Sequence, residues 1–124
     1  MYYGGILMSL EAITVKKQHA TIAVPLDTIL YMEKHSRQIT IYVTKGKDIC
    51  FYGKYDSVMP MLDERFAHPH KSYVINMQHI YRLGRQEAVM VSGHKIEMGG
   101  RSFGRLKRAY DEYIRENIRN RLGT

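Results

Sequence analysis

Residues 65–80, with the sequence RFAHPHKSYVINMQHI, are rich in groups that donate hydrogen bonds or carry positive charge. His68, His70 and Lys71 form a short basic stretch directly before the apolar run 73–75, which is typical of a buried strand. Imidazole and ammonium groups are costly to bury without partners. We therefore expect this stretch to be a loop that meets a polar or anionic partner.

A metal-dependent enzyme is one alternative, because imidazole is also a common metal ligand. His68 and His70 would share one face of an extended segment, and His79, His94 and Glu97 could add ligands. However, the sequence contains no HExxH or CxxC motif. We expect no enzymatic activity, no cofactor and no bound metal.

Length and charge limit the remaining functions. A chain of 124 residues fits one domain with a modest core. The formal net charge is +7, from 19 Lys+Arg against 12 Asp+Glu, which favours a polyanion such as nucleic acid or an anionic membrane surface. The single cysteine, Cys50, excludes an internal disulfide and a cysteine-rich zinc site.

The N-terminal stretch MYYGGILMSL lacks the basic flank and cleavage site of a signal peptide. Apolar runs elsewhere are far too short to span a membrane. We expect a cytoplasmic protein without membrane contact, in which residues 1–10 are a linker remnant and residues 11–124 form the domain.

Alternating apolar and polar residues dominate from Glu11 to Met98, which predicts a mainly β fold. The expected strands are AITVKK, ATIAVPL, TILYME, QITIYVT, KDICFYG, SYVI, HIYRL, EAVMVSG and HKIEM. A short mid-chain helix is expected over residues 55–64, where Val58, Met61 and Leu62 share a helical face. Apolar residues then recur at helical spacing, which predicts a C-terminal amphipathic helix over residues 102–119.

The order of these elements, together with a group of matching residues, resembles the LytTR domain, the DNA-binding output module of many bacterial response regulators. The matching residues are Phe66, His70, Lys71, Ser72, Tyr73, Val74, Asn76 and Ile80. The stretch ILYMEKHSRQITIYV is similar to the family's characteristic strand and loop, and the resemblance covers about residues 13–114. It implies elongated antiparallel β-sheets with small helices, whose loops enter successive major grooves of double-stranded DNA.

The resemblance implies that base-reading side chains come from three loops, and by position these are Arg37, Lys71 and Arg101. Each is a long cationic side chain at an expected loop or helix start, from which it can reach guanine O6 and N7 or a phosphate. Neighbouring polar groups are expected to contact the DNA backbone: His35, Ser36, His70, Ser102 and Arg105. The alternative is that solvated loops simply carry such residues.

Two departures from the family pattern affect these assignments. The family often has arginine at the position of Lys71, and a Ser-Arg-Arg type of turn where this chain has Gly100-Arg101-Ser102. Lysine lacks the guanidinium fork, so Lys71 is expected to contact a phosphate or a single base acceptor. Asn76 is shared with the family, and we expect it to bridge backbone groups of its turn rather than contact DNA.

These features predict a transcriptional regulator that binds specific DNA sequences, the output domain of a two-component response regulator. One small domain reaches little DNA, so two copies on repeated half-sites are expected, with the duplex bent toward Lys107, Arg108 and Arg115. The free protein is expected to be monomeric. The 124 residues leave no room for a receiver domain. We therefore expect a receiver domain as a partner only if this chain is part of a longer protein.

A protein-interaction module that uses an exposed sheet edge or the C-terminal helix is the other alternative. Such a module needs no cationic loops. Binding to nucleic acid weakens steeply with added salt, whereas binding in a hydrophobic groove does not, so salt dependence separates the two functions.

Overall fold

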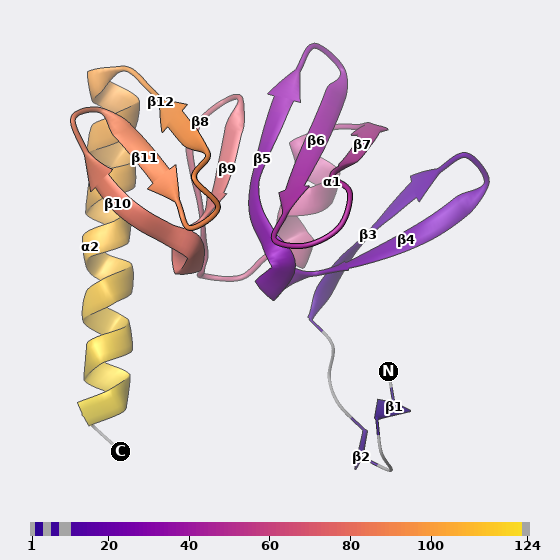
Figure 1. The fold of residues 1–124 in the computed structure, drawn as a ribbon, viewed down its shortest axis with the longest axis horizontal. Helices are drawn as coiled ribbons and strands as arrows, with labels where there is room; N and C mark the ends of the chain where they lie inside the picture. The colour runs from indigo at the N-terminus through magenta and orange to yellow at the C-terminus, as the bar shows by residue number, and fades with distance from the viewer. Residues whose placement is uncertain (1, 4–5, 8–10, 123–124) are drawn as a thin grey trace.

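The computed structural model describes residues 2–3, 6–7 and 11–122, which form antiparallel sheets followed by a long helix (Figure 1). Two short strands, β1 (Tyr2–Tyr3) and β2 (Ile6–Leu7), pair with each other. Apart from these four residues, the expected linker over residues 1–10 lies outside the described part of the chain, and its boundary stays a prediction. No helix in the described part combines the length and apolar character needed to cross a membrane.

Strands β3 (Ala12–Lys17) and β4 (Ala20–Pro25) form a longer hairpin, which is a separate two-stranded sheet and which we call the first hairpin. Its turn residues Gln18 and His19 have φ values of 50° and 67°, the left-handed values that match a two-residue turn to the twist of its strands. Ile13 anchors the base of the hairpin in the core, while the tip extends away from the rest of the molecule (Figure 1).

The central sheet has five antiparallel strands in the order β7-β6-β5-β9-β8. They are β5 (Ile29–His35), β6 (Gln38–Val43), β7 (Ile49–Tyr52), β8 (Phe66–His70) and β9 (Tyr73–Asn76). Glu33 of β5 lies opposite Tyr73 of β9. Because these neighbours run in opposite directions, the turn after β5 and the turn before β9 leave the sheet at the same edge, by which we mean the side formed by the strand ends.

A three-stranded sheet and the helices complete the fold. The sheet contains β10 (Ile80–Gly84), β11 (Glu87–Met90) and β12 (Lys95–Glu97). The helical elements are α1 (Tyr55–Val58), α2 (Gly100–Leu122) and the 3-10 turns η1 (Leu26–Thr28), η2 (Met59–Met61) and η3 (Met77–His79). The expected fold class, antiparallel sheets with a short mid-chain helix and a C-terminal helix, is confirmed.

The central sheet is buried on both faces, which gives the domain two cores. Val74 belongs to the core shared with the first hairpin and α1, and the next residue, Ile75, belongs to the core shared with the three-stranded sheet and α2. In β5, however, Leu30 and Tyr31 enter the same core. A break in strand register at this point accounts for the interruption, because a bulge lets successive side chains take the same side.

The expectation of a loop before the apolar run 73–75 is wrong in part, because residues 66–70 form strand β8. Residues Phe66–His70 pair with β9 as an edge strand, with a register shift between Ala67 and His70. Pro69 has no backbone donor, which only an edge strand or a bulge tolerates. The sequence of this strand lacks the β-branched residues that mark the others, so local pattern did not reveal it.

The two helices also differ from expectation in their lengths. The expected helix over residues 55–64 is one α-helical turn followed by η2, with Pro60 in the 3-10 turn. Proline removes one backbone donor and so favours the shorter form. In contrast, α2 begins at Gly100 and continues to Leu122, beyond the expected range of 102–119.

Asn76 is a fully buried polar residue at the end of β9. Its side-chain Nδ2 donates to the carbonyl oxygens of Leu26 at 3.3 Å and Ile29 at 2.8 Å, and its Oδ1 accepts from the backbone N–H of Gln78 at 2.9 Å. The expectation that Asn76 bridges backbone groups is confirmed. The bridge also reaches η1 and the start of β5, which are remote in sequence.

We expect Asn76→Ala to lower the free energy of unfolding by about 2 to 4 kcal/mol, because it strands several buried backbone groups without partners. Chemical denaturation followed by circular dichroism measures this. Gln78→Ala is the matched control, since that side chain is exposed, and its change should stay within about 0.5 kcal/mol. A loss below about 1 kcal/mol for Asn76→Ala would contradict the structural role.

Candidate nucleic-acid interface

Arg37 lies in the two-residue turn between β5 and β6, where His35 pairs with Gln38. His35, Ser36 and Arg37 are all exposed, and Ser36 has a left-handed φ of 59°. The backbone carbonyl of Arg37 accepts a hydrogen bond from the N–H of Gly53 at 3.1 Å. The turn is therefore held from the side by the end of β7, while the Arg37 side chain is free to extend into solvent.

Lys71 lies in the turn between β8 and β9 and is exposed. The next residue, Ser72, has a carbonyl oxygen that accepts from the backbone N–H of Lys34 and from the Tyr55 hydroxyl, each at 2.8 Å. The N–H of Ser72 donates to Nδ1 of His70 at 3.0 Å. Three bonds thus fix the turn, and because Nδ1 of His70 accepts, Nε2 carries the proton of the neutral ring.

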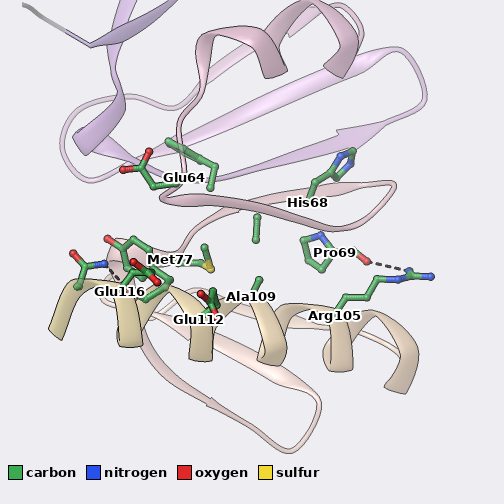
Figure 2. A pocket seen from close by; sticks show the side chains of 12 residues that line it. Glu64, His68, Pro69, Met77, Arg105, Ala109, Glu112 and Glu116 are labelled. Atoms are coloured by element: carbon green, nitrogen blue, oxygen red, sulfur yellow. Dashed lines mark hydrogen bonds between the residues drawn. The ribbon is translucent and has the colours of Figure 1, made fainter. Parts of the chain in front are cut away.

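Arg101 is exposed in the first turn of α2. Its neighbour Ser102 is only 8% exposed, so its hydroxyl has little access to an external partner. One turn further along, Nη1 of Arg105 donates to the carbonyl oxygen of Pro69 at 3.4 Å (Figure 2). This bond connects the start of α2 to the strand that leads into the Lys71 turn.

The structure brings the three expected loops to one side of the molecule. The turns that contain Arg37 and Lys71 leave the central sheet at the same edge because β5 and β9 are antiparallel neighbours. The start of α2, which contains Arg101, lies on this side as well (Figure 1). A single extended ligand could therefore contact all three cations.

The charge of this side differs from that of the groove between β8 and α2. Within residues 11–119, none of the ion pairs involves Arg37, Lys71 or Arg101. The groove, with a volume of about 420 Å³, has an apolar floor, and the carboxylates Glu64, Glu112 and Glu116 are among its lining residues (Figure 2). An anionic ligand is therefore favoured at the loops and disfavoured in the groove.

Three of the histidines considered as metal ligands contact other groups of the protein. The ring of His68 packs edge-on against Tyr55, His79 bonds to the carbonyl of Asp27, and His94 bonds to the hydroxyl of Ser92. Nowhere in the described part of the chain do three or more His, Cys, Asp or Glu side chains converge in a way that could hold a metal ion.

Three residues that sequence reasoning did not assign also shape this surface. The Tyr55 hydroxyl supports the Lys71 turn through its bond to the Ser72 carbonyl. In the sequence, Tyr55 looks like any other aromatic residue of the core. Lys34 and Lys54 line a hollow together with Arg37. Lys34 belongs to a polar segment visible in the sequence, but only the pairing of β6 with β7 brings Lys54 beside it.

Burial, followed by the nearby Glu33 carboxylate, raises the pKa of the Tyr55 phenol. An unfolded tyrosine ionises near pH 10, so the neutral phenol stabilises the fold below that pH and the contribution is lost as pH rises further. We expect Tyr55→Phe to lower the free energy of unfolding by about 1 kcal/mol at pH 7. The deficit should shrink above about pH 10, where wild-type protein loses this contribution.

The same variant should speed hydrogen exchange of the Lys34 amide, which shares the Ser72 carbonyl with Tyr55. Tyr52→Phe provides the control, because Tyr52 is 78% exposed and no hydrogen bond of its hydroxyl is found within the described residues. Equal exchange rates in the two variants, or a deficit independent of pH, would contradict a role for the Tyr55 hydroxyl in holding the turn.

Comparison with known proteins agrees with this arrangement. Among proteins with curated descriptions, none matches the sequence. One similar solved structure is the LytTR DNA-binding domain of a protein described as a methyl-accepting/DNA response regulator from Bacillus cereus, with a TM-score of 0.59 and 17% identity, covering 86% of this chain and 95% of that one. At this identity the likeness shows the fold alone. The sequence model of the LytTR DNA-binding domain matches residues 19–111, and the chain therefore belongs to the LytTR family of DNA-binding domains.

Proposed function

We propose that this protein regulates transcription in the bacterial cytoplasm by binding specific sequences of double-stranded DNA. The observation that carries the proposal is the common side of the molecule formed by the turns of Arg37 and Lys71 and the start of α2, which contains Arg101. All three side chains are exposed and lack ion-pair partners within residues 11–119. Membership of the LytTR family supports double-stranded DNA as the ligand.

Arg37 and Arg101 are the proposed base-reading residues, because an arginine fork can donate two hydrogen bonds to guanine in the major groove. Lys71 supplies a single ammonium group, which suits a phosphate or one base acceptor. The hydrogen bonds that fix the turns containing Arg37 and Lys71 support this assignment, since an ordered loop loses less entropy on binding.

His35, Ser36, His70 and Arg105 are proposed to contact the DNA backbone. His70 can do so through Nε2, because its Nδ1 already accepts from Ser72. Arg105 has further donors besides the one that contacts Pro69. Ser102 is the weakest member of the set we expected, since its hydroxyl is nearly buried, and only its backbone N–H at the start of α2 remains suitable for a phosphate.

We also propose that two copies bind repeated half-sites, and that a receiver domain controls this binding where the chain is part of a longer response regulator. A single domain of this size reads few base pairs, and a second copy supplies the missing specificity. Bending of the duplex toward α2 would depend mainly on Arg108. Lys107 and Arg115 already pair with Asp111 and Glu112 within the helix.

Selection of bound sequences from a random pool of duplex DNA, at moderate salt, tests the function directly. Recovery of one motif, present as two spaced copies, is the expected result. Binding that is insensitive to salt and recovers no motif would instead favour a protein-interaction module.

We expect Arg37→Ala or Arg101→Ala to cost about 1 to 3 kcal/mol on the selected site and to flatten the preference at one or two base pairs. Titration of matched and mutated sites, followed by fluorescence anisotropy, measures both effects. Arg119→Ala serves as the control, because Arg119 lies near the far end of α2 and pairs with Glu116. Equal losses on the selected site and on random DNA would rule out base contacts by the two arginines.

Lys71→Ala should weaken binding to all sequences to a similar extent and reduce the salt dependence, the slope of log K against log salt concentration, by about one unit. Lys71→Arg retains the charge and should restore the slope. If Lys71→Ala instead abolished selectivity at one base pair with an unchanged slope, Lys71 would be a base-reading residue.

A further inference from the structure

A second group of cations lies beside the proposed interface, on the first hairpin and next to the Arg37 turn. The ionisable side chains of residues 12–25 are Lys16, Lys17 and His19, and this segment contains no aspartate or glutamate. Lys16 and His19 are exposed near the hairpin tip, and Lys17 is partly exposed. The hairpin therefore presents positive charge without internal compensation.

Three adjoining hollows connect this hairpin to the Arg37 turn. The first is lined by Lys34, Arg37, Tyr52, Gly53 and Lys54. The second shares Tyr52 and Gly53 with the first, and shares Lys16 and Thr21 with a third hollow at the hairpin tip. The shared residues show that the surface is continuous from the β5–β6 turn, past the end of β7, to the tip of the first hairpin.

We call this surface the basic band and define it by its cations Lys16, Lys17, Lys34, Arg37 and Lys54. Among the residues that the structure describes, no carboxylate lines any of the three hollows. None of the ion pairs within residues 11–119 involves a band residue. Several charges of one sign that have no ion-pair partners create a strong local potential for a polyanion.

We propose that the DNA backbone continues past the Arg37 turn along the basic band and that the β3–β4 hairpin is an additional phosphate-binding arm. The proposal rests on the DNA-binding function proposed above and extends it to a part of the chain outside the three expected loops. Regularly spaced phosphates suit a row of flexible lysines, which need no fixed geometry to neutralise them. The lysines of the band thus add affinity and set the position of the domain, without reading bases.

The test compares two double variants of the whole chain that remove the same charge. Lys16→Ala with Lys17→Ala alters the hairpin arm. Lys45→Ala with Lys47→Ala is the control, because these exposed lysines lie in the β6–β7 loop, at the opposite end of β6 from the Arg37 turn (Figure 1). The probe is a duplex of about 30 base pairs with mixed random sequence, long enough to extend past one domain. Affinity is measured by anisotropy at several salt concentrations.

The arm variant should lose up to about two units of salt slope and bind at least about tenfold more weakly at low salt, whereas the control should keep a slope close to that of the wild type. A second pair, Lys34→Ala with Lys54→Ala, probes the middle of the band and should show the same loss. Thermal melting verifies that each variant is folded. If the arm variant does not fold, the salt slope of the Lys34→Ala, Lys54→Ala variant tests the proposal instead.

Slopes that are equal in the arm variant, the middle variant and the control would overturn the proposal. Loss of binding to phosphatidylglycerol vesicles, with the DNA slope unchanged, would also overturn it and assign the band to an anionic membrane surface. Failure of the proposed function gives a different result, because the wild-type protein would then bind duplex DNA without salt dependence. If Arg37→Ala weakens specific binding while the arm variant does not change the slope, only the arm is excluded.

Discussion

The buried amide of Asn76 is the interaction on which the arrangement of the proposed DNA-binding edge depends. It bonds to backbone groups on both sides of the boundary between β9 and β5, through Leu26 and Ile29 on one side and Gln78 on the other. A buried donor or acceptor without a partner costs about 1 to 3 kcal/mol, so a shift of either strand would be penalised at several atoms together. The pairing of β5 with β9, and hence the common edge of the Arg37 and Lys71 turns, follows from this register.

Burial of the central sheet on both faces fixes the register of the strands that end at that edge. Val74 and Ile75 point into different cores, so β9 cannot slip by one residue without exposing one apolar set and misplacing the other. The bulge in β5 lets Leu30 and Tyr31 fill the same core while the strand stays in register beyond it. Exposed turns on such a sheet keep their backbone positions, which is what a loop needs in order to present a side chain to a groove.

Charge is distributed so that the two kinds of surface are separated. Most carboxylates that form ion pairs do so on α2 or next to Arg65, and Glu64, Glu112 and Glu116 gather at the groove between β8 and α2. The cations of the loops and the basic band form no ion pair within residues 11–119. The excess of basic residues is therefore not a uniform property of the surface. The cations of the loops and the basic band lie where the strand order places the turns, and their combined potential favours the proposed approach of DNA to this side.

The sequence by itself determined the elements whose signals are local. Period-two alternation predicted most of the strands, and the helical spacing of Phe103 and Leu106 predicted α2. The resemblance to the LytTR family also indicated Arg37, Lys71 and Arg101 as candidate DNA contacts, an assignment that stays a prediction. Only the tertiary structure decided that β8 is an edge strand, that Tyr55 holds the Lys71 turn, and that Lys54 and the first hairpin adjoin the Arg37 turn. These features depend on which distant strands become neighbours. That choice is made by burial on two faces of one sheet and by buried hydrogen bonds such as those of Asn76, and neither leaves a periodic trace in a short stretch of residues.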